Sequence, residues 1–218
     1  MREMPRSTRL AGARLAVLVT GGPRGRTALD LARAALEGGA QMIQLREKEL
    51  SDRELLDLAE RTRELCRAAG ALFIVNDRPD VARLAGADGV HVGSTDLPAG
   101  GARAIVGKRA LVGVSAHDEA EIDAALQAGA DYLGIGTVYP SGTKPGLPAR
   151  GLEVVRLAAR STSLPFFAIG GIAIERLAEV LAAGARGVAV SGAILQAPDP
   201  RAATEAFRRV LDAHFGEA

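Results

Sequence analysis

The chain has 218 residues, enough for one large core, and its 27 Lys and Arg residues nearly balance 26 Asp and Glu residues, so the net charge is +1. A nucleic-acid-binding protein usually carries a basic excess, so this balance argues against that class and favours small anions as ligands. No apolar run approaches the roughly 18 residues that span a bilayer, so we expect no membrane segment. Cys66 is the only cysteine, which excludes an intramolecular disulfide and fits a reducing, cytoplasmic location.

The first 14 residues differ in composition from the rest of the chain. They lack the apolar segment of a secretory signal and carry a basic excess from Arg2, Arg6, Arg9 and Arg14. We expect residues 1–14 to be a flexible basic arm and residues 15–218 to form one domain.

Short apolar runs rich in Val, Ile and Leu then alternate with segments of helical periodicity. This pattern is typical of a parallel sheet covered by helices. We predict eight strands, over residues 15–20, 42–46, 72–75, 89–92, 111–115, 132–136, 166–169 and 187–190. Between the second and third strands we predict a helix over residues 51–69, which Ser51 and Glu54 begin with a capping box.

A recurring Gly-Ala pair separates helical segments from the strands that follow them. The pairs lie at residues 39–40, 70–71, 86–87, 129–130 and 184–185. Glycine commonly ends a helix, so the repeat indicates successive β-α modules. Eight modules in about 200 residues predict an α/β fold with a single (β/α)8 TIM barrel, whose active site lies at the carboxyl ends of the strands. The alternative, an open doubly wound sheet, would need a nucleotide fingerprint that the sequence lacks.

The end of the second predicted strand carries three long polar side chains at alternating positions. Gln44, Arg46 and Lys48 would share one face of an extended strand and point together into the mouth of the barrel. An amide and two cations in one place favour an anion site. The alternative is a strand end whose charges are simply solvated.

Two carboxylates follow other strands at the same end of the barrel. Asp77 and Asp96 suit Mg²⁺, which takes one or two protein carboxylates and completes its octahedron with water and phosphate oxygens. The alternative is that they pair with nearby Arg and Lys side chains. Asp88 and Asp131 each precede a strand, so we assign them to the opposite end, where polar residues serve stability.

Glycine-containing pairs follow the seventh and eighth predicted strands. Gly170-Gly171 and Ser191-Gly192 occupy the place where many barrels bind a phosphate through backbone N–H groups. A Gly-Gly pair is also an ordinary turn, and the two pairs together predict a second anion pocket made of amides.

From about Val17 to its C-terminus the chain resembles the thiamine-phosphate synthase family and its relatives, the TenI-type thiazole tautomerases. The motifs that carry this resemblance are Ile43-Gln44-Leu45-Arg46-Glu47-Lys48, Val75-Asn76-Asp77-Arg78, Gly89-Val90-His91-Val92-Gly93 with Asp96, Gly113-Val114-Ser115-Ala116-His117, Tyr139 to Lys144, and Ile169-Gly170-Gly171-Ile172.

The resemblance implies a Mg²⁺-dependent transferase. Such an enzyme condenses 4-amino-5-hydroxymethyl-2-methylpyrimidine diphosphate with 4-methyl-5-(2-phosphoethyl)thiazole by a dissociative substitution, and it releases thiamine phosphate and diphosphate. The resemblance further implies that the pyrimidine diphosphate is held by Gln44, Arg46, Lys48, Asn76 and Lys144, with Ser115 beside its ring. It implies that Mg²⁺ is held by Asp77 and Asp96, and the thiazole phosphate by Ser141, Thr143, Gly171, Ser191 and Gly192. Arg46, Lys48, Ser115 and Lys144 would act on the reacting groups.

The chain departs from the family pattern at three strand ends. Gly21 stands where an acidic residue is frequent, Ser141 stands where threonine is usual, and the eighth strand ends in Ser191-Gly192. The last two departures touch the thiazole phosphate pocket. Serine keeps a hydroxyl and backbone amides do not depend on a side chain, so we expect altered affinity and retained function.

Two alternative functions remain. A thiazole tautomerase needs a proton shuttle, and Thr137 stands where some of those relatives have histidine. A non-catalytic regulator that binds thiamine precursors would show a broken diphosphate site, which this sequence does not. We interpret His91 as a core histidine and His117 as a helix cap. The second predicted helix and the helix over residues 199–214 could support a homo-oligomer.

Overall fold

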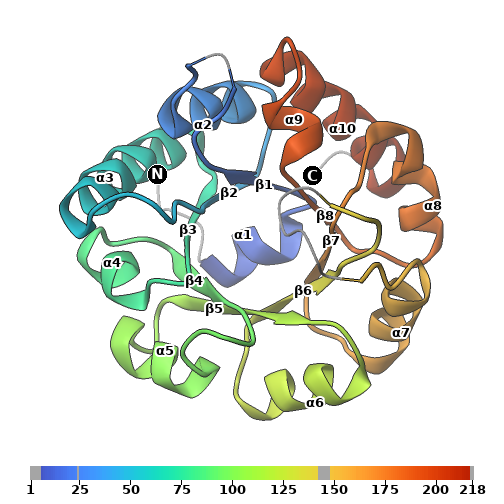
Figure 1. Cartoon of the computed structure of the whole chain (residues 1–218). Helices are drawn as coiled ribbons and strands as arrows, with labels where there is room; N and C mark the ends of the chain where they lie inside the picture. Colours follow the sequence, from blue (N-terminus) through green and yellow to red (C-terminus); the bar gives the residue numbers. More distant parts are fainter. Residues whose placement is uncertain (1–5, 24, 142–147, 217–218) are drawn as a thin grey trace.

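A computed structural model describes residues 6–23, 25–141 and 148–216 of the chain. Eight parallel strands form a closed barrel in sequence order, and β1 pairs with β8 to complete it (Figure 1). The strands are β1 (Leu15–Val19), β2 (Met42–Leu45), β3 (Leu72–Asn76), β4 (Gly89–Val92), β5 (Leu111–Ala116), β6 (Tyr132–Gly136), β7 (Phe166–Ile169) and β8 (Val188–Val190). Each differs from its predicted range by at most one residue at either end, so the (β/α)8 prediction is confirmed.

Helices surround the barrel as an outer ring (Figure 1). They are α2 (Ala28–Glu37), α3 (Asp52–Ala69), α4 (Pro79–Leu84), α5 (Ala99–Val106), α6 (Glu119–Gln127), α7 (Glu153–Ser161), α8 (Leu177–Ala182) after the 3-10 turn η1 (Ile174–Arg176), α9 (Gly192–Leu195) and α10 (Pro200–Phe215). The predicted capping box is present at α3, where the Ser51 side chain accepts from the Glu54 N–H and the Glu54 carboxylate accepts from the Ser51 N–H. Among the described residues, no helix is both long and apolar enough to cross a membrane.

The apolar core has two layers because strand side chains alternate between the two faces of the barrel. Outward-facing residues such as Val17, Ile43 and Phe73 pack against the helices. Inward-facing residues such as Met42 and Tyr132 fill the barrel itself. The inward-facing side chains near the carboxyl ends of the strands therefore lie above this inner core, at the mouth of the barrel.

Helix α1 (Arg6–Gly12) lies across the amino-terminal end of the barrel (Figure 1). Leu10 is 4% exposed and packs on the inner core. Arg6 Nε and Arg9 Nη2 each lie within ion-pair distance of Asp88 Oδ1, at 2.7 and 2.8 Å. The expectation of a flexible arm is thus wrong for residues 6–12. This helix is too short for a periodic apolar pattern, and its contacts are made with residues distant in the sequence.

Candidate active site

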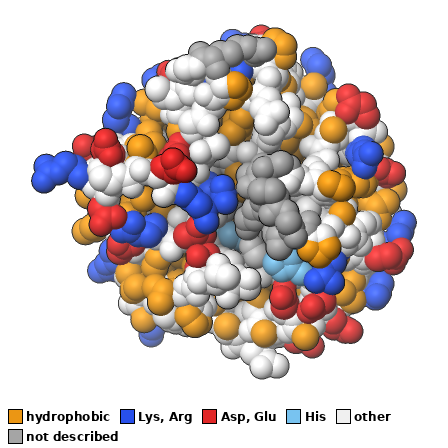
Figure 2. All heavy atoms as spheres, viewed as in Figure 1, with side chains coloured by type: hydrophobic (Ala, Val, Ile, Leu, Met, Phe, Trp, Pro, Cys, Tyr) orange, Lys and Arg blue, Asp and Glu red, His pale blue; other side chains and the backbone are white. Residues whose placement is uncertain are grey.

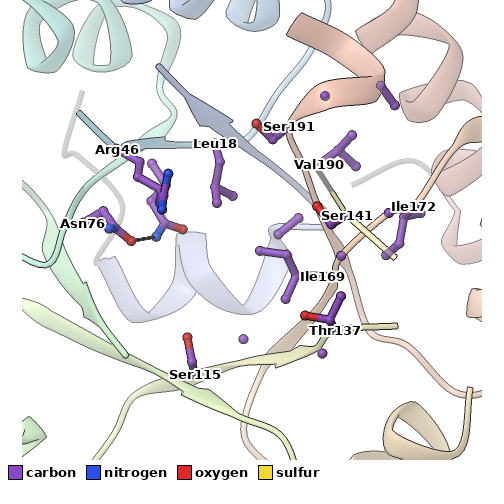
Figure 3. Close-up of a pocket in the computed structure, with 18 of the residues that line it drawn as sticks. Leu18, Arg46, Asn76, Ser115, Thr137, Ser141, Ile169, Ile172, Val190 and Ser191 are labelled. Carbon is purple, nitrogen blue, oxygen red and sulfur yellow. Dashed lines mark hydrogen bonds between the residues drawn. The ribbon is translucent and has the colours of Figure 1, made fainter. Parts of the chain in front are cut away.

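A cavity of about 360 Å³ opens at the carboxyl ends of the strands. Its volume lies in the range of small-molecule sites. Residues from β2 and β3 line one side of the cavity, and residues that follow β7 and β8 line the other (Figure 3). The predicted site residues that line it are Gln44, Arg46, Asn76, Ser115, Ser141, Gly171, Ser191 and Gly192.

The β2 and β3 side presents amides and one cation. Gln44 Nε2 donates a hydrogen bond to Asn76 Oδ1 at 2.7 Å, shown as the dashed line in Figure 3. Arg46 extends into the same space, and its Nε is buried and makes no hydrogen bond to any described residue. A guanidinium group that lines a cavity is suited to bind an anionic ligand there. The arrangement therefore fits the predicted anion pocket.

Lys48 does not line the cavity, which corrects the prediction that it shares a face with Gln44 and Arg46. Strand β2 ends at Leu45, so the alternation of side chains does not continue as far as Lys48. Its side chain is 59% exposed, and its Nζ lies 3.5 Å from Asp77 Oδ2 at the rim. Figure 2 shows basic and acidic side chains next to one another near the centre of this face. Lys48 can therefore contribute to binding from the rim and not from the cavity wall.

Asp77 and Asp96 are brought together at this rim. Asp77 has a positive φ of 64°, and its N–H donates to the His91 carbonyl at 2.8 Å. Asp96 Oδ2 accepts from the Gly93 N–H at 2.7 Å. Burial raises the pKa of the Asp77 carboxyl, and the neighbouring Asp96 raises it further, while Lys48 opposes the shift. A divalent cation would relieve this repulsion between two carboxylates.

The donor set suits Mg²⁺. Within the described ranges, no group of three or more His, Cys, Asp and Glu side chains could hold a metal ion. A site made of two carboxylates would leave the remaining positions of an octahedron to water and substrate phosphate, which is how Mg²⁺ is usually bound.

Loops that follow β7 and β8 form the opposite side of the cavity. Gly171 has a φ of +59°, and a Cβ atom there would lie 2.4 Å from the Pro140 carbonyl oxygen. Glycine therefore allows this loop to pack against the turn that carries Ser141. Ser191 and Gly192 lie where β8 leads into the short helix α9. The predicted residues Thr143 and Lys144 lie outside the described residues.

The structure adds lining residues that the sequence analysis did not assign to the site. They include Leu18, His91, His117, Thr137, Ile169 and Gln196. Inward alternation on β1 and β7 would have found Leu18 and Ile169. No local signal points to Gln196, which the single turn of α9 brings to the cavity. Tyr139 is outside the cavity, where its hydroxyl donates to Glu179 at 2.5 Å and braces the turn.

His91 and His117 differ in part from their interpretations. His91 is 7% exposed and hydrogen-bonded in the barrel, as expected of a core histidine, yet it also lines the cavity. His117 precedes α6, and its backbone N–H and its ring Nδ1 both contact the Glu121 carboxylate at 2.8 and 2.6 Å. The cap of α6 is Asp118, whose side chain accepts from the Glu121 N–H at 3.0 Å, so the interpretation of His117 as the helix cap is wrong.

Fold and site together define a (β/α)8 barrel with a cavity at the carboxyl ends of its strands, lined by polar side chains of β2 and β3 on one side and by the loops after β7 and β8 on the other. The family profile described as thiamine monophosphate synthase matches residues 16–194. The chain belongs to this family.

Similarity to individual members of the family supports this assignment. A thiamine-phosphate synthase of Mycolicibacterium smegmatis is 47% identical over 84% of this chain and 86% of its own length. A thiamine-phosphate synthase of Gloeobacter violaceus is 48% identical over 94% of this chain, which spans 59% of that relative. The solved structure of a thiamine phosphate pyrophosphorylase from Pyrococcus furiosus is 37% identical over 96% of this chain and all of its own, with a TM-score of 0.87.

Proposed function

We propose that this protein condenses 4-amino-5-hydroxymethyl-2-methylpyrimidine diphosphate with 4-methyl-5-(2-phosphoethyl)thiazole to give thiamine phosphate and diphosphate. The observation that carries the proposal is the Arg46 side chain, which lines the cavity and whose Nε makes no hydrogen bond within the described part of the chain. The Gln44–Asn76 pair lies beside it, and the amide-rich loops at Gly171 and Gly192 lie across the cavity. Two separate anion pockets suit two substrates that each carry phosphate.

The reaction needs stabilised charge more than it needs a strong base. The carbon–oxygen bond to the diphosphate breaks with its electron pair on the leaving group, and the thiazole nitrogen supplies the pair for the new carbon–nitrogen bond. Arg46, Asn76 and Lys144, which lies outside the described residues, would bind the departing diphosphate. Mg²⁺ held by Asp77 and Asp96 would neutralise part of its charge. Preorganised charge of this kind is often the largest catalytic contribution.

The cavity floor supports the same assignment. Leu18 and Ile169 are apolar lining residues between the two polar sides (Figure 3). A flat, weakly polar ring pair would contact this floor while its phosphate groups reached the two sides. Ser115, on β5, lies on the wall where the pyrimidine ring would be held. We also propose that the protein acts in the cytoplasm, a reducing compartment that its single cysteine fits.

The proposal is tested by incubating the purified protein with both substrates and Mg²⁺ and measuring thiamine phosphate and released diphosphate. We expect both products in equal amounts, and Arg46→Ala should lower kcat roughly 100-fold or more, on the scale of a lost electrostatic donor. Arg53→Ala, an exposed position on α3, is the matched control and should retain full activity.

The same assay separates the alternatives. Isomerisation of the thiazole carboxylate phosphate without condensation would assign the protein to the tautomerases, although Thr137 is a poor proton shuttle at the end of β6. Binding of both precursors without turnover would indicate a regulator.

A further inference from the structure

Three side chains form a hydrogen-bonded row inside the barrel. The Tyr132 hydroxyl lies 3.3 Å from His91 Nδ1, and His91 Nε2 lies 3.0 Å from Ser115 Oγ. Tyr132 is 2% exposed, and Ser115 and His91 line the cavity. The row therefore runs from the closed interior of the barrel to the site where a substrate would bind.

Two inward-facing glycines make room for this row. A Cβ atom at Gly113 would lie 2.1 Å from Tyr132 Cζ, and one at Gly134 would lie 3.0 Å from His91 Cε1. Any larger residue at Gly113 would displace the tyrosine ring. The tyrosine ring also packs edge-on against Phe167, with ring centroids 5.9 Å apart. The positions of both rings are thus set by the strands. What remains to be decided is which group donates and which accepts in each of the two hydrogen bonds.

The Tyr132 hydroxyl decides that direction. Its contact with His91 is its one hydrogen bond among the described residues. Burial raises the pKa of Tyr132 far above its ordinary value, so the hydroxyl keeps its proton. If His91 carried its proton on Nδ1, the Tyr132 proton would be buried with no acceptor in the described structure, which typically costs about 1 to 3 kcal/mol.

The opposite arrangement satisfies all three groups. The Tyr132 hydroxyl donates to Nδ1, and Nε2–H donates to Ser115 Oγ. The serine oxygen then accepts from His91, so its own proton is available for an acceptor in the cavity. In the reverse arrangement Ser115 would donate to His91 and present lone pairs toward an anionic substrate.

We infer that Tyr132 is a positioning residue that holds His91 as the Nε2–H tautomer, so that Ser115 donates a hydrogen bond to its substrate. This inference rests on the proposed function for the identity of that substrate, and the acceptor belongs to the pyrimidine diphosphate. Tyr132 contacts no substrate itself and acts through His91.

Nitrogen-15 NMR of the ligand-free protein tests the tautomer directly, because protonated and unprotonated imidazole nitrogens resonate far apart. The chain has three histidines, and a His91→Asn sample identifies the signals of His91. We expect a protonated Nε2 and an unprotonated Nδ1 in the wild type. In Tyr132→Phe, which keeps the ring and removes the hydroxyl, a measurable fraction should carry the proton on Nδ1. A wild-type Nδ1–H form, or an unchanged tautomer in Tyr132→Phe, would overturn the inference.

Kinetics test whether the effect passes through Ser115. Tyr132→Phe should lower kcat/KM for the pyrimidine diphosphate about fivefold, the scale of one hydrogen bond, and should have no further effect in a Ser115→Ala background. An equal loss in both backgrounds would show a general structural effect and contradict the inference. Phe73→Leu, a fully buried residue of the outer core layer, is the control, which should lower stability and leave the tautomer unchanged.

The two arms separate this inference from the proposed function. Protein that shows the expected tautomer and its response to Tyr132→Phe but makes no thiamine phosphate would contradict the proposed function and leave the hydrogen-bond order in place. Protein that makes thiamine phosphate but holds His91 as the Nδ1–H tautomer would contradict this inference and leave the proposed function in place.

Discussion

The Gln44 side-chain amide donates to the Asn76 side-chain carbonyl at 2.7 Å, which joins the ends of β2 and β3 inside the cavity. This bond uses Oδ1 of Asn76 as the acceptor and leaves its NH₂ group as a donor for a ligand. The Gln44 carbonyl oxygen remains an acceptor. The pair thus offers one donor and one acceptor, which suits a phosphate oxygen and the amino group of an aminopyrimidine.

Asn76→Asp tests this division. The carboxylate can still accept from Gln44 Nε2, so the strand ends should stay joined and the melting temperature should change by no more than a few degrees. The new charge cannot donate and repels a diphosphate, so kcat/KM for the pyrimidine diphosphate should fall roughly 100-fold. Steady-state kinetics with either substrate varied provide the measurement. A loss confined to the thiazole phosphate would place Asn76 in the wrong pocket.

The paired carboxylates predict an effect of pH on the metal-free protein. Burial and Asp96 raise the pKa of Asp77, so the folded state binds this proton more tightly than the unfolded chain does. The stabilisation is present at low pH and is lost as pH rises through the folded pKa. Asp77→Asn removes the charge, so in EDTA its melting temperature should exceed that of the wild type at pH 7. The difference should shrink as pH falls through the raised pKa of Asp77, because the wild-type carboxyl then takes up its proton.

With Mg²⁺ present, the wild type should have a higher melting temperature than Asp77→Asn. A ligand that binds the folded state raises its stability, so Mg²⁺ should raise the melting temperature of the wild type. Asp77→Asn should respond weakly, and its synthesis of thiamine phosphate should be nearly absent. EDTA should stop synthesis by the wild type. Equal rates with and without EDTA would remove the metal role from Asp77 and Asp96.

Much of the fold was predictable because parallel barrels repeat one local pattern. Apolar runs, helical periodicity and Gly-Ala stops each depend on a few neighbouring residues, and all eight strands were found within a residue. Gly70 shows why, since it ends α3 in the left-handed conformation that its sequence position predicts. Helix α1 was missed because its stability comes from Asp88 and the barrel interior, which lie far away in the sequence.

The sequence predicted which strand ends carry the site residues, but it predicted less well how their side chains are arranged in space. Alternation correctly brought Gln44 and Arg46 to one cavity, because Arg46 directly follows β2, but failed at Lys48, which lies further beyond the end of the strand at Leu45. The resemblance supplied residue types for the mouth, and spacing could not reveal that Tyr132 and His91 connect Ser115 to the interior. Such contacts cross three strands and depend on how inward rings pack.

Lys144 and Thr143 were predicted to serve different substrates, and this prediction stands on the sequence. Lys144→Ala should lower kcat roughly 100-fold, because it removes a charge that matters most as diphosphate leaves. Thr143→Ala removes a neutral hydrogen bond made before and during reaction, so it should mainly raise KM for the thiazole phosphate. Initial rates over a grid of both substrates separate the two effects. A Lys144→Ala enzyme with normal kcat would contradict the assignment.

Asp88 and Asp131 are two carboxylates that we expect to stabilise the fold without acting in the site. Each precedes a strand and accepts from the backbone of its neighbour, Asp88 from Phe73 N at 3.0 Å and Asp131 from Val112 N at 2.7 Å. The Asp88 side chain is 13% exposed and its partner Arg9 is 11% exposed, whereas the Asp131 side chain is 36% exposed. Removal of the more buried carboxylate should therefore cost more.

Asp88→Ala takes the carboxylate from two arginines of α1 and from one backbone donor, so we expect unfolding free energy to fall by about 3 kcal/mol. Asp131→Ala, whose ion pair with Arg103 is better solvated, should lose about 1 kcal/mol. Denaturant titration measures both losses. Because these carboxylates lie at the amino-terminal end of the barrel, kcat at a temperature where each variant is folded should match the wild type. Equal losses of stability would contradict the ranking by burial. A lowered kcat in folded Asp88→Ala would show that α1 acts on the mouth through the barrel interior.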